Sequence, residues 1–175
     1  MTYKIMIVDD EPVNLRTLTR LLRETYEVVT AESGAEALTL LQQHNVALMI
    51  SDQRMPGMTG IELMKNTVAQ RPHMVKILLT GYTDVGALIE SINCGLVYRY
   101  LTKPWNNEDL KQTVARALEH YETTKSKHQL EMENSRLRIR LGQISDLALE
   151  GVDEGRPPVP DVGPHFIDRL AQRIG

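Results

Sequence analysis

The sequence predicts an α/β protein built on a doubly wound parallel sheet of five strands. Short apolar runs alternate with stretches of helical periodicity along residues 3–120. The last three runs are almost wholly apolar, as expected for strands that helices cover on both faces. Strands that alternate with helices pair in parallel through right-handed crossovers. We expect strands at residues 4–8, 27–31, 47–51, 75–79 and 97–101, with helices between them.

Capping residues mark helix starts independently of the apolar pattern. Ser or Thr stands three residues before Glu at two predicted helix starts, which is the spacing of a capping box, and Asn precedes Asp at the last one. The run at residues 27–31 is shorter and more polar than the others, so we expect it at an edge of the sheet. Together these features predict a flavodoxin-like strand order. The capping pairs are Ser33 with Glu36, Thr59 with Glu62, and Asn106 with Asp109.

The last predicted helix continues far beyond the need of a compact domain. Residues 107–150 contain no proline and only one glycine, Gly142. The first part places apolar residues at helical spacing and should dock on the sheet, whereas the later part repeats them in heptad steps. A short coiled coil that dimerises the chain is the expectation, with a solvated linker helix as the alternative. The docking residues are Leu110, Val114, Ala117, Leu118 and Tyr121, and the heptad residues are Leu130, Asn134, Leu137, Leu141, Ile144 and Ala148.

These features divide the chain into four parts. Residues 1–122 form the sheet domain, and residues 123–150 form the helical extension. Residues 151–164 are rich in glycine and proline and read as a linker. Residues 165–175 are either a tail or the start of a missing output domain, because so short a helix is marginal alone.

Composition narrows the class of protein. The chain has 175 residues, of which 42% are hydrophobic and 25% charged, as in a globular protein of ordinary size. Its net charge of −3 gives no net basic surface for nucleic acid, which leaves only a local basic strip as an alternative. No run is long enough to span a membrane and the start does not resemble a signal peptide, so we expect a cytoplasmic protein. Cys94 is the only cysteine, which excludes an intrachain disulfide and a cysteine-based metal site.

Polar residues follow four of the five predicted strands. Asp9 and Asp10 follow the first, Asp52 the third, Thr80 the fourth and Lys103 the fifth. Because the carboxyl ends of parallel strands share one edge, folding gathers these side chains into one cleft. Clustered carboxylates repel one another unless a cation compensates them, and hard oxygen ligands suit Mg²⁺. The central Asp52 could then attack phosphorus, with Lys103 and Thr80 stabilising the phosphoryl oxygens.

Four motifs resemble the CheY-like receiver domain of two-component response regulators. They are Val-Asp-Asp-Glu-Pro at 8–12, Ser-Asp-Gln-Arg-Met-Pro-Gly-Met-Thr-Gly at 51–60, Leu-Leu-Thr-Gly-Tyr at 78–82 and Tyr-Leu-Thr-Lys-Pro-Trp at 100–105. The resemblance covers about residues 1–120. Four ordered motifs, each at a predicted strand end, are far more specific than any one of them.

The resemblance implies a phosphoacceptor site that depends on Mg²⁺. Asp52 would accept a phosphoryl group from a histidine kinase or a phosphotransfer protein. Asp10, Asp52 and the backbone carbonyl of Arg54 would bind the metal, and Asp9 would support it through water. The chain would be no enzyme beyond catalysing its own phosphorylation and dephosphorylation.

The resemblance also assigns a switch. Lys103 and Thr80 would hold the phosphoryl group, and Tyr100 would turn inward when Thr80 moves, which changes the surface near the fourth and fifth helices. It further suggests a cis peptide bond between Lys103 and Pro104. Arg54 and Tyr82 would border the phosphoryl group, from which we hypothesise slow autodephosphorylation; unchanged decay after replacing both with small residues would refute this.

Simpler structural roles compete with some of these assignments. Asp9 or Asp10 could cap the first helix with the help of Pro12. Thr80 could bond its own backbone, and Tyr100 could be a half-buried core aromatic. Lys103 could be a surface lysine in a turn.

Two classes of function remain open. In the first class, the chain is a phosphorylation-dependent regulator that controls dimerisation or an output module. In the second class, it is the regulatory receiver portion of a truncated signalling enzyme, such as a cyclic-dinucleotide phosphodiesterase, or of a transcriptional regulator. The motifs around Thr80 and Lys103 resemble receivers that precede cyclic-dinucleotide phosphodiesterase domains or hydrogenase-type transcriptional regulators.

Overall fold

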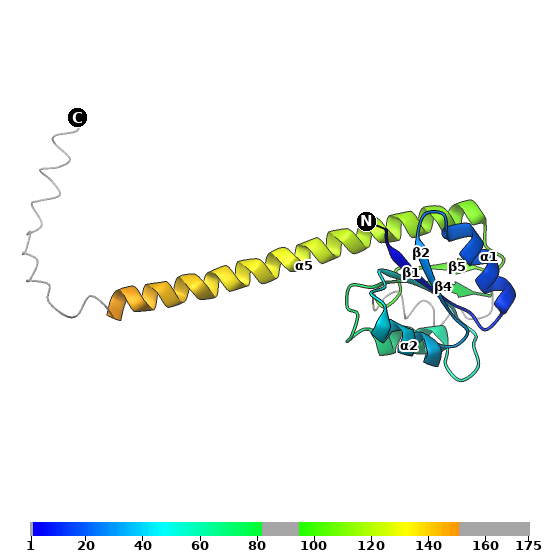
Figure 1. Ribbon diagram of the computed structural model, residues 1–175, viewed down its shortest axis with the longest axis horizontal. Coiled ribbons are helices and arrows are strands. Elements are labelled where there is room, and N and C mark those ends of the chain that lie inside the picture. The colour runs from blue at the N-terminus through cyan, green and yellow to red at the C-terminus, as the bar shows by residue number, and fades with distance from the viewer. Residues whose placement is uncertain (1, 82–94, 151–175) are drawn as a thin grey trace, which may run out of the picture. The chain divides into compact units, whose positions relative to one another are not determined.

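The computed structural model describes residues 2–81 and 95–150, with side chains described as far as residue 143. It contains one parallel sheet in the order β2-β1-β3-β4-β5, which confirms the predicted fold and the edge position of the second strand (Figure 1). The strands are β1 (Lys4–Val8), β2 (Glu27–Ala31), β3 (Leu48–Asp52), β4 (Val75–Thr80) and β5 (Arg99–Thr102). The helices are α1 (Pro12–Leu22), α2 (Gly34–Gln43), α3 (Gly60–Thr67) and α5 (Asn107–Glu150).

The strand bounds differ slightly from those predicted. Strands β3, β4 and β5 each end one residue later than expected, so Asp52 and Thr80 are the last residues of their strands. Strand β5 begins at Arg99 because its register with β4 starts at the pair of Arg99 and Ile77. Val97 is buried but precedes this ladder. The helix expected between the fourth and fifth strands falls largely on residues 82–94, which lie outside the described residues.

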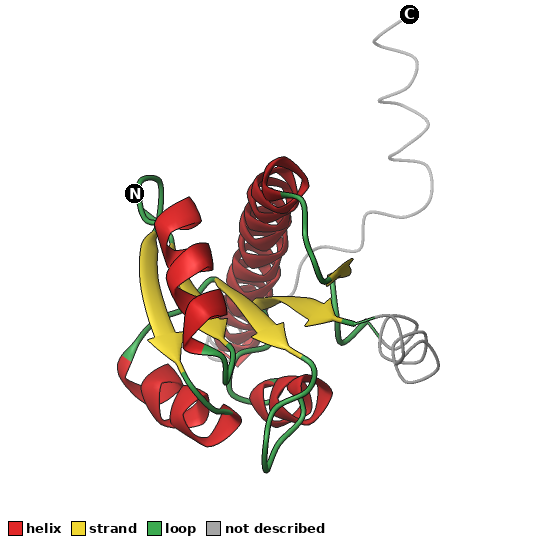
Figure 2. Cartoon of the chain, turned by 90° about the vertical axis from the view of Figure 1, so that its right-hand side faces the viewer, coloured by secondary structure: helices red, strands yellow, loops and turns green. Residues whose placement is uncertain are grey.

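Side chains alternate between the two faces of the sheet and build two cores. In β1, Ile5 and Ile7 join the core beneath α1 and α5, whereas Met6 and Val8 join the core beneath α2 and α3. This alternation follows from the two-residue period of a strand. Figure 2 shows helices on both sides of the sheet, the arrangement that the nearly continuous apolar runs predicted.

The capping signals are largely confirmed. Thr59 and Glu62 form a complete capping box at the start of α3. Ser33 caps α2 by accepting a hydrogen bond from the Glu36 backbone N–H, but the Glu36 carboxylate accepts from the N–H of Glu32 instead. At the start of α5, the Asn106 side chain accepts from the backbone N–H groups of residues 108 and 109.

Helix α5 belongs to two units of the molecule. The compact unit that carries the sheet extends to His128, six residues past the predicted boundary, and a second unit begins at Gln129. In the first unit, Leu110, Val114 and Ala117 are fully buried, as predicted for the docking face. In the second unit, every described side chain from 129 to 143 is exposed. Among the described residues, no helix is long and apolar enough to cross a membrane.

Candidate functional site

The predicted site residues meet at the carboxyl edge of the sheet because the backbone ties neighbouring strand ends together. The N–H of Asp9 donates to the carbonyl of Ala31 at 3.2 Å, so the chain stays in the sheet for one residue beyond β1. The N–H of Gln53 donates to Leu79 at 2.9 Å, and that of Lys103 donates to Thr80 at 2.8 Å. Asp9, Asp52 and Lys103 therefore start from fixed positions on adjacent strand ends.

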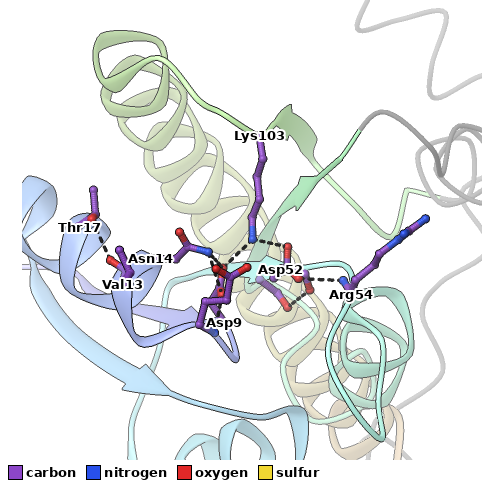
Figure 3. A network of polar contacts seen from close by, with 9 residues as sticks. Asp9, Val13, Asn14, Thr17, Asp52, Arg54 and Lys103 are labelled. Carbon is purple, nitrogen blue, oxygen red and sulfur yellow. Dashed lines mark hydrogen bonds and ion pairs between the residues drawn. The ribbon is translucent and has the colours of Figure 1, made fainter.

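Lys103 connects the two aspartates across this edge. Its Nζ atom lies 2.7 Å from Asp52 Oδ1 and 2.9 Å from Asp9 Oδ2 (Figure 3). The Lys103 side chain is only 22% exposed, and those of Asp9 and Asp52 are 0% and 8% exposed. The surface role of Lys103 is thus excluded, and the peptide bond to Pro104 is cis as the resemblance suggested.

The electrostatics of the site keep Lys103 charged. Burial alone lowers the pKa of its ammonium, but the hydrogen bonds and negative charges of Asp52 and Asp9 outweigh burial, so the net pKa is raised. A group whose pKa rises on folding contributes stability below its unfolded pKa and loses it only as the pH rises through the folded value. Lys103 therefore carries its positive charge throughout the neutral range.

Asp9 is the most enclosed member of the site. Its Oδ1 atom accepts a hydrogen bond from the backbone N–H of Glu11 at 2.9 Å. The Asn14 side-chain amide donates to both carboxylate oxygens at 3.1 Å, and Lys103 approaches Oδ2. These contacts satisfy a carboxylate with no solvent exposure, which would otherwise be very costly to bury. Asp9 does bond a backbone N–H just before α1, but the cap residue of that helix is Glu11.

Sequence reasoning missed Asn14. The residue lies on the first turn of α1 at the edge of the site, where its amide is directed at Asp9 (Figure 3). A signal was available: Asn14 is the third residue of a helix that begins two residues after the acidic pair, so its side chain projects back toward the helix start. A polar amide there faces the strand end.

Asp52 is held by backbone as well as by Lys103. Its Oδ2 atom accepts the Arg54 backbone N–H at 2.9 Å. The Arg54 side chain is exposed and extends away from the Asp52 carboxylate in Figure 3. Tyr82, the other residue expected to screen an acyl phosphate, lies outside the described residues, so the hypothesis of slow dephosphorylation stays a prediction.

The start of α3 rests directly on the strand end that carries Asp52. The N–H of Gly60 donates to the Gln53 carbonyl at 3.0 Å, and the N–H of Ile61 donates to Gln53 Oε1 at 3.2 Å. A Cβ atom on Gly60 would overlap the carbonyl oxygen of Asp52. Glycine is therefore required at this close approach.

The residues present suit a hard divalent cation. Asp9, Asp10 and Asp52 bring carboxylates to one edge of the sheet, and oxygen ligands are those that Mg²⁺ prefers. Asp10 is half-buried, and its side chain makes no hydrogen bond or ion pair with another described residue. Within the described part of the chain, however, no three acidic, His or Cys side chains form a ready-made metal cluster. The Lys103 ammonium lies between Asp9 and Asp52 and now compensates both.

Thr80 and Tyr100 occupy positions that differ in burial. Thr80 is 3% exposed, and its hydroxyl donates to the Gly81 carbonyl at 3.0 Å, as in the simpler role considered for it. The Tyr100 residue, by contrast, is 43% exposed. The Tyr100 ring is therefore not in the inward position expected of the switch. The switch roles of Thr80 and Tyr100 stay predictions.

A cavity of about 530 Å³ borders the site on the side of α1. Asn14 and Thr17 of α1 line it together with Lys103, Pro104 and Trp105. Trp105 is half-buried and packs against the core beneath α1 and α5. The cavity thus brings the only tryptophan of the chain next to Lys103.

Comparison with known proteins identifies the family. The family model for the response regulator receiver domain matches residues 5–115 of the sequence. The chain belongs to this receiver family. The hydrogenase transcriptional regulatory protein HoxA of Cupriavidus necator is 37% identical over 129 residues, which is 74% of this chain and 27% of that protein. The C4-dicarboxylate transport transcriptional regulatory protein DctD of Rhizobium meliloti is 32% identical over 175 residues, 97% of this chain and 33% of that protein.

Solved structures agree with this assignment. A structure described as adenylate cyclase from Rhodopirellula baltica has a TM-score of 0.72 at 35% identity and covers 74% of this chain and 97% of its own. The signal receiver domain of an HD domain-containing protein from Pseudomonas fluorescens Pf-5 has a TM-score of 0.67 at 36% identity, covering 70% and 99%. The chain spans about a quarter to a third of the length of these curated relatives. It is a response regulator receiver, homologous to those of transcriptional regulators.

Proposed function

We propose that Asp52 is the phosphoacceptor of this receiver. The observation that carries the proposal is the contact of 2.7 Å between Lys103 Nζ and Oδ1 of the buried Asp52 carboxylate, at the edge where strand ends meet. In the reaction, an Asp52 oxygen attacks the phosphorus of a phosphohistidine on a histidine kinase or phosphotransfer protein. A P–O bond forms, the P–N bond breaks, and the imidazole leaves.

Lys103 and Thr80 stabilise the transferred group in this proposal. The Lys103 ammonium is already at the carboxylate, so it can balance charge on a phosphoryl oxygen with little rearrangement. The Thr80 hydroxyl would exchange its bond to the Gly81 carbonyl for a bond to a second phosphoryl oxygen. Tyr100 would respond to that movement of Thr80 by turning inward.

Mg²⁺ would be held by Asp10 and Asp52 with the Arg54 backbone carbonyl, and Asp9 would support it. When bound, the ion supplies positive charge that neutralises the phosphoryl oxygens. The Asp9 carboxylate accepts one hydrogen bond from Glu11, two from Asn14 and one from Lys103. These contacts support a role for Asp9 in positioning the charged groups of the site.

The test is intact-mass analysis after incubation with Mg²⁺ and acetyl phosphate, with Asp52→Asn as the matched variant. We expect one phosphoryl adduct on the wild type and none on Asp52→Asn. An adduct on both would place the phosphoryl group elsewhere. No adduct on either would indicate a degenerate receiver that signals by protein contacts alone.

We further propose that the receiver controls transcription through an output module, and that it dimerises through residues 107–150. The alignment with DctD extends over 97% of the chain, past the receiver itself, which favours this class over a regulated enzyme such as a cyclic-dinucleotide phosphodiesterase. The coding sequence that follows codon 175 tests it. A DNA-binding module there supports the proposal, whereas a phosphodiesterase domain contradicts it.

A further inference from the structure

Aromatic rings at the amino edge of the sheet contact α5 near the strand starts. Residues that precede β1, β4 and β5 each place a ring against a ring of α5. One of these contacts joins two imidazoles, and both rings carry nitrogen atoms that can bind a metal ion. The three pairs are Tyr3 with Tyr121, His73 with His128, and Tyr98 with His120.

The two imidazoles are spaced as ligands of one ion would be. The centroids of the His73 and His128 rings lie 4.7 Å apart, and the ring planes are tilted by 48°. Imidazole nitrogen binds Zn²⁺ at about 2.0–2.1 Å, so two imidazoles on one tetrahedral ion have centroids about 5 Å apart. We infer that His73 and His128 form a site for a divalent transition-metal ion of the class that imidazole suits, which includes Zn²⁺.

The ring nitrogens of this pair are available for a metal ion. Neither imidazole makes a hydrogen bond or an ion pair with another described residue, whereas His44 Nδ1 lies 3.4 Å from Lys4 Nζ. His73 is half-buried and His128 is exposed, so water reaches the pair. Within the described part of the chain, no third acidic, His or Cys side chain joins them, and water would complete the coordination of the ion.

The cationic side chains closest in sequence to the two histidines have other partners. The Arg71 guanidinium donates to the backbone carbonyls of Leu41 and His44 at the end of α2. The Lys125 ammonium lies over the Tyr121 ring, 5.4 Å from its centroid. These contacts hold both positive charges at other groups, which lowers their repulsion of a cation between the imidazoles.

Packed neighbours fix the backbone at both ligands. Met74, the residue after His73, is 4% exposed. Tyr121, two turns before His128, is 8% exposed and meets the ring of Tyr3 edge-on. Both ligands therefore start from packed parts of one unit, which ends at His128, and little ordering is needed for binding. A bound ion would tie the end of α5 in this unit to the turn before β4.

Isothermal titration with Zn²⁺ tests the site in the full chain carrying Cys94→Ser, which removes the single thiol. Excess Mg²⁺ is present to compete for the acidic edge. His73→Phe and His128→Phe each keep an aromatic ring without its nitrogens. The Kd for Zn²⁺ should rise by at least about tenfold, because even loss of a partner behind a ligand costs about 10–100-fold. His120→Phe is the matched control, since its ring packs on Tyr98.

The expected result is one Zn²⁺ per chain, bound equally well by the Cys94→Ser parent and by His120→Phe. Absence of binding by the parent, or an unchanged Kd in His73→Phe, would overturn the inference. Half an ion per chain would do so too, because the ion would then bridge two chains. Asp52→Asn separates this site from the proposed phosphoacceptor site. Binding retained in Asp52→Asn supports the histidine pair, whereas binding lost there would place the ion at the acidic edge.

Hydrogen exchange gives a second readout at the site itself. An ion shared by α5 and the turn before β4 restrains both, so Zn²⁺ should slow the exchange of backbone amides at residues 121–128. This slowing should appear in the Cys94→Ser parent and in His120→Phe but not in His73→Phe. Equal slowing in His73→Phe would show that Zn²⁺ acts on α5 without the imidazole pair.

Discussion

Two lysines at opposite ends of the same sheet have opposite environments. Lys103 follows β5 at the carboxyl edge and contacts two aspartates, which raise its pKa. Lys76 lies near the start of β4, is 5% exposed, and donates only to the Met74 carbonyl at 3.2 Å among the described residues. Burial lowers the pKa of Lys76. Asp9 and Asp52 compensate the charge of Lys103 at the carboxyl edge of the sheet. Among the described residues, no carboxylate forms an ion pair with the buried Lys76, so burial of its charge is costly.

The largest effect is expected from Lys103→Met, which removes the compensated charge. Loss of one preorganised donor to a reacting group costs about 100-fold or more in rate, so adduct formation from acetyl phosphate should slow by that factor. A time course of intact mass measures it. Lys111→Met, at an exposed lysine on α5, is the control and should keep the wild-type rate. Equal rates of adduct formation in the two variants would contradict a role for Lys103 in phosphoryl transfer.

Lys76→Met should stabilise the protein, whereas Lys103→Met should slow its reaction. Replacing a buried ammonium with an apolar side chain of similar length should raise the free energy of unfolding by about 1–3 kcal/mol, measured by urea titration. Lys65→Met, at an exposed position on α3, is the control. A loss of stability in Lys76→Met would contradict the environment described for this lysine.

The pH dependence separates Lys76 from the other lysines. Because its folded pKa lies below the ordinary 10.5, the unfolded state binds more protons between these two values. Wild-type stability should therefore gain with rising pH across that window, and Lys76→Met should lack this gain. The check is a series of urea titrations at alkaline pH. Identical slopes for the two proteins would be the contrary result.

Asn14→Leu sharpens the comparison at the Lys103 end. It leaves the buried Asp9 carboxylate without the Asn14 amide, which should lower stability by about 1–3 kcal/mol and slow adduct formation. Asn66→Leu on the exposed surface of α3 is the control. If Asn14 only filled space, Asn14→Leu would keep both the wild-type stability and the wild-type rate.

The smallest effect is expected from a third lysine of the sheet, Lys4. Its Nζ lies 2.8 Å from Glu27 Oε1, but the Glu27 side chain is 58% exposed. Exposed ion pairs contribute about 0–1 kcal/mol, so Glu27→Gln should change the urea midpoint little. A change as large as that of Lys76→Met would show that geometry, rather than burial, ranks these lysines.

The fold could be predicted from the sequence because its evidence is local. The apolar runs place every strand to within two residues, and the capping residue Thr59 marks its helix start. The gathering of Asp9, Asp52 and Lys103 follows from strand order alone. The role of Asn14 could not be predicted, because it depends on the direction of one side-chain amide. The burial of Lys76 could not be predicted either, because an apolar run with one lysine does not reveal whether that lysine reaches solvent.

The position of Trp105 determines where the tryptophan fluorescence of the protein originates. The chain has only this one indole, and it shares a cavity with Lys103 and Asn14. Its emission therefore originates at a single point beside the site, without contributions from tryptophans elsewhere. Ultraviolet fluorescence of the unlabelled protein can thus follow events around Lys103 in real time.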